Sequence, residues 1–87
     1  MRADVKKVTN LLKTAKGQVD GILKMVEDDR YCVDISNQIL AVQSLLRKVN
    51  NEILKAHMNG CVKEAFETGQ GEEKIDEIMK IIEKYYK

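Results

Sequence analysis

The fold of this chain is decided by one uninterrupted stretch, residues 32–68, whose sequence is CVDISNQILAVQSLLRKVNNEILKAHMNGCVKEAFET. Its apolar residues recur at alternating steps of three and four, which is the spacing of one face of an α-helix. They are Ile35, Ile39, Val42, Leu46, Val49, Ile53 and Ala56. The stretch has no proline, and its one glycine, Gly60, allows a kink near that point. The pattern therefore predicts a single long helix from about Cys32 to about Thr68.

The segment before this stretch predicts a second amphipathic helix. Its apolar stripe has the heptad spacing and comprises Val5, Val8, Leu12, Ala15, Val19, Ile22 and Val26. Gly17 and Gly21 interrupt the stripe at a cost of about 1 kcal/mol each relative to alanine, which favours close packing of another backbone there. The stripe stops at residues 28–31, so we expect a short turn between the two helices.

A third helix is predicted after a break at residues 68–71. It begins near Glu72, and its acidic first turn suits the positive end of a helix dipole. Its apolar stripe is formed by Ile75, Ile78, Ile82 and Tyr85. The sequence thus predicts an all-α fold with three helices per chain.

The chain has 87 residues and a net charge of +1, which indicates a single domain over residues 1–87. Such a short chain buries a modest core, so oligomerisation would help it. We see no secretory signal peptide and no stretch of membrane-spanning length. Two cysteines in a chain of this type are typical of reduced thiols rather than of a disulfide scaffold. We therefore expect a cytoplasmic protein with no membrane partner.

Three side chains predict a metal site: Cys32, His57 and Cys61. Two sulfurs and one imidazole suit Cu(I) or Zn(II) better than Mg(II) or Ca(II). His57 and Cys61 are four residues apart and share one face of a helix. Cys32 lies 25 residues before His57, about 37 Å along a helix that rises ~1.5 Å per residue. Cys32 could reach only the His57 and Cys61 of a second, antiparallel chain, which predicts a metal site between subunits.

The same register brings apolar residues together. If Cys32 lies opposite the midpoint of His57 and Cys61 in the second chain, the two-fold axis passes near Leu45 and Leu46. Ile35 then faces Ala56, and Val42 faces Val49. The alignment of the two chains that brings the three ligands together is also the one that pairs their apolar residues. This agreement favours an antiparallel four-helix-bundle dimer.

Other interpretations of the two cysteines stay open. Buried cysteines often pack as small hydrophobes. A Cys32–Cys61 disulfide between subunits is a further alternative, which a reducing cytosol disfavours. A structural Zn(II) site normally has four protein donors, whereas the three donors here suit a three-coordinate Cu(I) site.

Several motifs resemble the copper-sensing repressors of the CsoR/RcnR family of bacterial metal and thiol sensors. The resemblance is carried by Tyr31-Cys32-Val33-Asp34 and by His57-Met58-Asn59-Gly60-Cys61-Val62. It extends through residues 12–22 and 38–44 and covers nearly the whole chain. It implies an all-helical dimer that pairs into a tetramer. It also implies a trigonal Cu(I) site, made by Cys32 of one chain with His57 and Cys61 of the other.

The resemblance also implies a function. In the copper sensors of this family, Cu(I) binding releases operator DNA and derepresses copper-export genes. Tyr31 and Glu77 match the positions that link the metal site to this allosteric change. The nickel and cobalt sensors use further histidines, and the persulfide sensors lack the histidine. Because His57 is the only histidine of this chain, the ligand set favours a copper sensor.

The DNA-binding side has a weaker signal. Six basic residues on the first two helices form a candidate phosphate-contacting surface. They are Lys6, Lys7, Lys13, Lys16, Arg47 and Lys48. Scattered lysines are more often an ordinary solvated helix face. Two arginines that contribute to operator binding in relatives are replaced here by Leu11 and Asn51.

Three functions follow from these observations. The first is a Cu(I)-responsive transcriptional repressor that binds operator DNA as a homodimer or homotetramer. The second is a Cu(I) buffer without DNA binding, and the third is a thiol or persulfide sensor that uses Cys32 and Cys61. We expect no enzymatic activity and no small-molecule substrate, because the sequence has no phosphate-binding loop and no constellation of base and nucleophile.

Overall fold

The computed structural model describes residues 1–69, residues 71–84 and the backbone of residue 85. They form three α-helices: α1 (Val5–Glu27), α2 (Cys32–Thr68) and α3 (Gly71–Tyr85). The predicted all-α fold is confirmed, and α2 has the predicted bounds. Helix α3 begins at Gly71, one residue before the predicted start. Two elements of the prediction, Gln70 in the second break and the Tyr85 side chain in the last stripe, lie outside the described residues.

Local hydrogen bonds fix the ends of the helices. The Asp4 carboxylate accepts the backbone N–H groups of Lys6 and Lys7 and so caps the start of α1. At the other end, Asp29 adopts the left-handed conformation with φ 52°. The backbone N–H groups of Asp29 and Arg30 then donate to the carbonyl groups of Val26 and Met25. This pattern is a Schellman motif, which ends α1 and turns the chain into α2.

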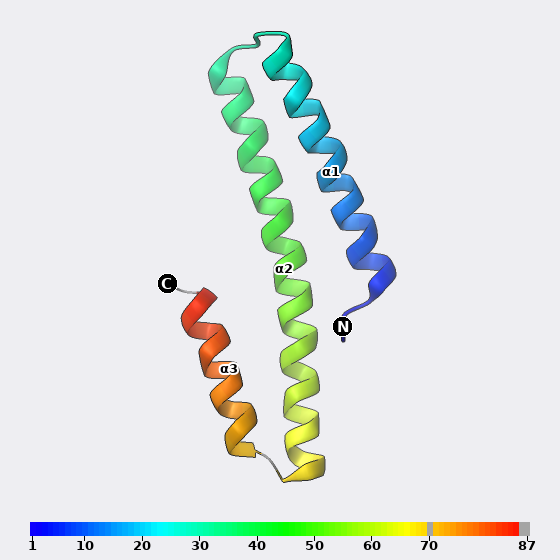
Figure 1. Cartoon of the computed structure of the whole chain (residues 1–87), viewed down its shortest axis with the longest axis vertical. Helices are drawn as coiled ribbons and strands as arrows, with labels where there is room; N and C mark the ends of the chain where they lie inside the picture. Colours follow the sequence, from blue (N-terminus) through cyan, green and yellow to red (C-terminus); the bar gives the residue numbers. More distant parts are fainter. Residues whose placement is uncertain (70, 86–87) are drawn as a thin grey trace.

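The three helices lie side by side in one layer (Figure 1). Helices α1 and α2 form an antiparallel hairpin, and α3 folds back along the C-terminal half of α2 on the side away from α1. Within the described residues, α1 and α3 make no contact with each other. The chain measures 58 × 29 × 12 Å. Since a helix with its side chains is about 10–12 Å across, the chain is one helix thick.

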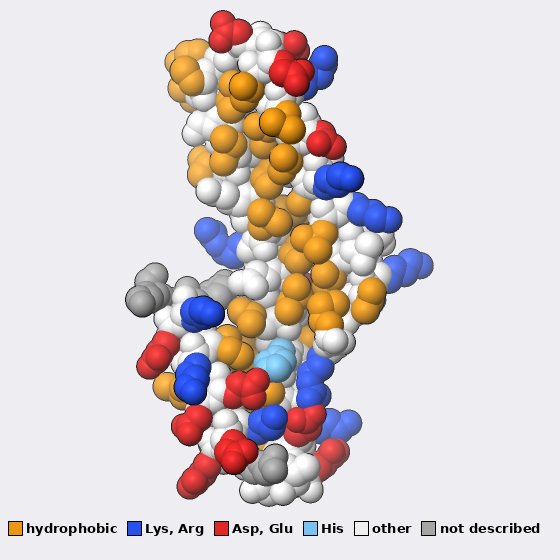
Figure 2. All heavy atoms as spheres, in the orientation of Figure 1, with side chains coloured by type: hydrophobic (Ala, Val, Ile, Leu, Met, Phe, Trp, Pro, Cys, Tyr) orange, Lys and Arg blue, Asp and Glu red, His pale blue; other side chains and the backbone are white. Residues whose placement is uncertain are grey.

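A layer one helix thick buries few side chains. Among the described residues the buried apolar ones are Val8, Ala15, Val42, Val49 and Cys61. Apolar side chains gather instead on one face of the α1–α2 hairpin (Figure 2). We call this surface the open face and define it by five exposed residues: Leu12, Val19, Leu23, Ile39 and Leu46. Their helical spacing places them on the same side of the hairpin. The open face needs a cover that the single chain does not provide.

Two details of packing differ from the prediction. Val42 and Val49, predicted to pair across a dimer seam, are only 7% and 3% exposed within the single chain. The contact between α1 and α2 already covers them within one chain, which leaves little of their surface for a second chain. No described atom outside the immediate helix backbone lies within 4 Å of a Cβ built at Gly17 or Gly21. The close approach expected at those glycines therefore does not occur within this chain.

Candidate metal centre

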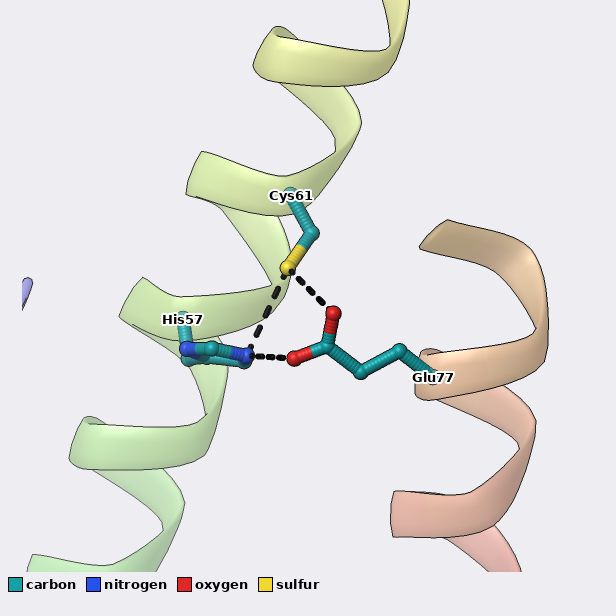
Figure 3. Close-up of side chains that lie close together, drawn as sticks. All are labelled: His57, Cys61 and Glu77. Atoms are coloured by element: carbon teal, nitrogen blue, oxygen red, sulfur yellow. Dashed lines mark hydrogen bonds and ion pairs between the residues drawn. The ribbon is translucent and has the colours of Figure 1, made fainter. Parts of the chain in front are cut away.

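Helices α2 and α3 bring three potential metal-binding side chains together near the C-terminal end of α2 (Figure 3). His57 and Cys61 lie on successive turns of α2, with 3.4 Å between the Nε2 and Sγ atoms. Glu77 approaches from α3, and its Oε1 lies 2.6 Å from His57 Nε2. Its Oε2 lies 3.8 Å from Cys61 Sγ. A nitrogen, a sulfur and an oxygen donor are thus collected in one chain, all within 4.8 Å of one another.

The chain reversal after α2 positions Glu77. Gly69 adopts a left-handed conformation with φ 72°, and its N–H donates to the carbonyl group of Ala65. The helix ends there, and α3 returns along α2. Cys61 becomes 1% exposed under this cover, whereas His57 and Glu77 keep part of their surface open. The site is therefore half enclosed, with the sulfur at its inner end.

The contact with His57 determines the ionisation of Glu77. A hydrogen bond from the imidazole holds the pKa of the Glu77 carboxyl below its usual range, and partial desolvation opposes this effect. The ionised carboxylate can only accept hydrogen bonds, so His57 Nε2 carries the proton. In a neutral imidazole the lone pair is then on Nδ1. To bind a metal ion together with the Cys61 sulfur, His57 Nε2 would have to lose its proton, and Glu77 would have to move away. To bind the ion through Nδ1 instead, the imidazole ring would have to rotate.

Charged side chains extend the cluster away from the sulfur. Lys74 Nζ lies 3.8 Å from Glu77 Oε2 and 3.4 Å from Glu64 Oε2. Glu64 in turn forms an ion pair with Arg2, which precedes α1. Positive and negative groups alternate along this row, so each charge faces an opposite one. The sequence analysis did not find Arg2, Glu64 or Lys74. The Lys74–Glu77 spacing was a visible signal, but no sequence pattern pairs Arg2 with a residue of α2.

Two residues predicted for the site lie at the opposite end of α2. Cys32 is the first residue of the helix and is exposed. Tyr31 stands at its N-cap position without a side-chain capping bond and is also exposed. Because one continuous helix joins Cys32 to His57, the two are separated by about 37 Å of helix axis. One chain brings together His57, Cys61 and Glu77, and it does not bring Cys32 or Tyr31 to them.

The donor set fits a soft or borderline metal ion. A thiol sulfur and an imidazole nitrogen, 3.4 Å apart, are ligands that Cu(I) and Zn(II) prefer. Both Mg(II) and Ca(II) require a shell of oxygen atoms, and Glu77 alone provides carboxylate oxygen here.

The predicted DNA-binding residues lie along the α1–α2 hairpin. Lysine side chains line the outer edge of α1 (Figure 2). Lys6, Lys13 and Lys16 of α1 are exposed. Lys7 differs, because its Nζ forms an ion pair with Glu52 of α2 at 3.2 Å. Arg47 and Lys48 are exposed on α2. Lys7 is therefore the weakest of the six as a partner for phosphate.

Comparison with known proteins identifies the family. The sequence model of the metal-sensitive transcriptional repressors matches residues 4–84. The copper-sensing transcriptional repressor CsoR of Bacillus subtilis (strain 168) is 46% identical over 80 residues, which cover 92% of this chain and 79% of that protein. The CsoR of Mycobacterium ulcerans (strain Agy99) is 46% identical over 70 residues, 80% of this chain and 60% of that protein.

Solved structures show the same fold. The copper-sensing repressor CsoR with Cu(I) from Geobacillus thermodenitrificans NG80-2 superposes with a TM-score of 0.86 at 43% identity, over 95% of this chain and 86% of that one. The nickel-responsive transcriptional regulator InrS superposes with a TM-score of 0.89 at 28% identity, over 98% of this chain and 96% of that one. None of the described helices has the length and apolarity to cross a membrane. The family model, the sequence identities and the fold agree that the chain belongs to the family of metal-sensitive transcriptional repressors, which are regulators and not enzymes.

Proposed function

We propose that this chain is a Cu(I)-responsive repressor, which binds operator DNA when metal-free and releases it when Cu(I) binds. The observation that carries this proposal is the contact between the Cys61 sulfur and the His57 imidazole, 3.4 Å apart. The similarity to CsoR proteins, one of them solved with Cu(I), supports copper as the metal. Such a regulator acts in the cytoplasm, where its operator lies.

Cys32 of a second chain would complete the site. Seven turns of a helix contain about 25 residues, so Cys32 and His57 lie on the same side of α2 although they are far apart along it. Ile39 and Leu46 lie on that side too, and both belong to the open face. A second chain laid antiparallel on the open face would cover the apolar residues and bring its Cys32 to His57 and Cys61. The same interface would thereby bury the apolar residues and complete the metal site.

A second apolar surface supports pairing of two such dimers into a tetramer. A groove of about 390 Å³ runs between α2 and α3 and is lined by seven residues: Val62, Ala65, Phe66, Gly71, Lys74, Ile75 and Ile78. The Phe66 side chain at its rim is 88% exposed. This groove lies at the α2–α3 end of the chain, apart from the open face. Two separate apolar surfaces are what a dimer of dimers requires.

The contact between His57 and Glu77 provides a route from metal to protein conformation. Cu(I) supplies an electrophilic centre that the thiolates and the imidazole ligate when it is bound. To serve as a ligand, His57 must either give up the Nε2 proton that it donates to Glu77 or rotate its ring. Either change alters the contact by which α3 is held on α2. We infer that the position of α3 distinguishes the metal-free from the metal-bound state.

The metal assignment depends on the ligands, since the fold matches both a copper-sensing and a nickel-responsive regulator. Ni(II) sites favour several nitrogen or oxygen donors in a square-planar arrangement. With one histidine and two cysteines the chain offers a sulfur-rich set. Copper is therefore the better match for this site.

The test is a gel shift with the DNA upstream of the chain's own gene, at low and moderate salt, with and without one equivalent of Cu(I). We expect a shifted band that Cu(I) abolishes and that Ni(II) leaves in place. Wild-type protein that binds Cu(I) but no DNA at low salt would favour a Cu(I) buffer. DNA release by an oxidant or persulfide, with no response to Cu(I), would favour a thiol sensor.

A further inference from the structure

The end of α3 lies beside the middle of α2, and the two helices form the walls of an open hollow there (Figure 1). The hollow has a volume of about 620 Å³ and is lined by five residues: Gln43, Leu46, Arg47, Asn50 and Lys84. Lys84 is the one lining residue that α3 contributes, and it stands in the last turn of that helix. The hollow is therefore built jointly by the two helices that also build the metal centre.

The polar groups of this hollow are cations and hydrogen-bond donors. Arg47 offers a guanidinium group and Lys84 an ammonium group, and the amides of Gln43 and Asn50 offer further N–H donors. Among the described residues that line the hollow there is no carboxylate. A ligand that satisfies these groups must carry negative charge and several oxygen acceptors, and a phosphate group has both.

The two cations of the hollow are available to such a ligand. Neither Arg47 nor Lys84 forms an ion pair with any described residue, and both are exposed. Lys7 differs, because its charge is already paired with Glu52 at 3.2 Å. Two positive charges on one hollow repel each other, and a bound anion would remove this repulsion.

The hollow is large enough for nucleic acid and would stay accessible in the proposed dimer. A volume of about 620 Å³ has room for a stretch of sugar-phosphate backbone. Leu46 belongs to the open face, so a second chain on that face would border the hollow at this residue. Arg47 lies about 100° further around α2, so it would stand beside the second chain and not beneath it.

The hollow lies two helical turns from the metal centre along both helices. Seven residues separate Glu77 from Lys84 on α3, and this is about 10 Å of helix axis. The same number separates His57 from Asn50 on α2. A change of the His57–Glu77 contact that shifts α3 therefore also shifts Lys84 relative to Arg47.

We propose that this hollow is a phosphate site for the operator backbone, and that Lys84 is the residue through which the position of α3 acts on DNA affinity. The inference rests on the proposed function. In the metal-free state the His57–Glu77 contact holds α3 on α2, and Arg47 and Lys84 bind one backbone phosphate together. When His57 serves as a metal ligand, that contact changes and Lys84 moves away from Arg47. The phosphate then loses one of its two cations, and DNA affinity falls.

The site is tested by measuring the affinity of the metal-free protein for operator duplex over a range of salt concentrations. Lys84→Ala should weaken binding several-fold and reduce the slope of log affinity against log salt by about one for each chain that contacts DNA. Lys84→Arg keeps the charge and should bind like the wild type. Lys80→Ala removes the same charge one turn earlier in α3, outside the hollow, and is the matched control. Equal affinity and equal salt slope in Lys84→Ala and Lys80→Ala would overturn the site.

The shared phosphate and the coupling to α3 have separate measurements. Arg47→Ala combined with Lys84→Ala should weaken DNA binding by less than the product of the two single effects, because both side chains serve one phosphate. Fully independent effects would contradict the shared site. Cu(I) should lower the DNA affinity of the wild type by a larger factor than that of Lys84→Ala. An equal factor in both proteins would mean that Lys84 contacts DNA alike in both states, which contradicts the coupling.

Free phosphate is the other source of the same chemistry, and inorganic phosphate is its probe. It is titrated into the metal-free protein while NMR follows the side-chain N–H signal of Arg47, and we expect operator duplex to displace it. A shifted Arg47 signal together with unchanged DNA affinity in Lys84→Ala would assign the hollow to a free anion and contradict the DNA contact.

The failures of the two proposals are distinguishable. Wild-type protein that binds no operator DNA at low salt contradicts the proposed function. Wild-type protein that binds DNA and releases it with Cu(I), while Lys84→Ala binds and releases it in the same way, contradicts the present inference alone.

Discussion

The two ends of helix α2 are built in opposite ways. Its N-terminal half carries Ile39 and Leu46 on the open face, and both residues stay 44% exposed within the described chain. Its C-terminal end carries His57 and Cys61, whose polar atoms find Glu77 on α3. The first end exposes apolar side chains, and the second end has polar side chains that contact Glu77. The proposed metal ligands lie at both ends, so under the proposed function the contact between chains that completes the site also covers the apolar half.

The largest effect should come from breaking the apolar end. Leu46→Lys places a charge on the open face beside the predicted two-fold axis, so both copies contribute to the cost. Loss of a buried leucine and burial of an ammonium group cost at least about 4 kcal/mol per dimer. We expect this variant to sediment as a monomer and to lose high-affinity Cu(I) binding, although every ligand is intact.

The control for this substitution is Asn37→Lys, which adds the same charge on the opposite side of α2. It should sediment like the wild type and bind Cu(I) normally. If Leu46→Lys sediments as the wild-type oligomer and keeps its Cu(I) affinity, the open face is not the interface that completes the site.

The next effect concerns the ligand that the apolar end contributes. Cys32→Ala leaves the cluster of His57, Cys61 and Glu77 untouched and should leave assembly intact. We expect Cu(I) affinity to fall by more than about 100-fold, since loss of residues merely supporting a metal ligand already costs about 10–100-fold. Chelator competition gives the affinity. X-ray absorption of the wild-type Cu(I) form should show two sulfur neighbours and one nitrogen neighbour, and a spectrum with nitrogen or oxygen neighbours alone would contradict the ligand set.

A smaller effect on affinity, with a large effect on response, is expected at the polar end. His57→Ala leaves two thiolates, which suffice for Cu(I), so affinity should stay within about tenfold of the wild type. Without the imidazole, metal binding no longer changes the contact with Glu77, and the difference in affinity between the two states shrinks. Titration of operator DNA with and without Cu(I) checks this. Full release of DNA by Cu(I) in His57→Ala would mean that the imidazole does not couple metal to DNA.

The smallest effect is a pH dependence of the charged row beside the site. Hydrogen bonds from Arg2 and Lys74 hold the pKa of the Glu64 carboxyl below its ordinary 4.5. A lowered folded-state pKa adds stability that is complete above pH 4.5 and is lost as the pH falls through the folded-state value. We expect the difference in unfolding free energy between wild type and Glu64→Gln to shrink below pH 4.5. Denaturant unfolding at one fixed protein concentration measures it, and a difference that grows on acidification would contradict the ion pairs.

Sequence periodicity predicted the helices well because the spacing of apolar residues in a long amphipathic stretch is specific to an α-helix. The turn at residues 28–31 follows from the end of the first apolar stripe at Val26, and the end of α2 follows from the glycine-containing break at residues 68–71. The spacing does not predict which neighbouring helix each apolar stripe packs against. Val42 and Val49 were predicted for a seam between chains and pack within the hairpin instead, since the pattern shows that a residue is covered but not by what.

The candidate site was predictable in part for a related reason. His57 and Cys61 are neighbours by helix geometry alone, so their spacing was sufficient. Glu77 entered only through resemblance to a family, because its place beside His57 depends on how α3 returns after Gly69. The ion pair between Arg2 and Glu64 joins residues 62 positions apart and left no signal in the sequence. No close approach is found within the described chain at Gly17 or Gly21, whereas the Arg2 side chain lies against Gly60, a contact that the sequence did not predict.

The thickness of the molecule has a consequence for how the protein exists in the cell. A single layer 12 Å thick keeps little surface from water. If two chains pair on the open face as proposed, association contributes to the stability of the fold, and the unfolding midpoint should rise with protein concentration by mass action. The number of copies of the chain in the cell would thus affect the stability of each copy. Dilution would then separate the chains, and the metal site would be lost together with the fold. A cell that makes few copies would contain fewer assembled sensors than the number of chains suggests.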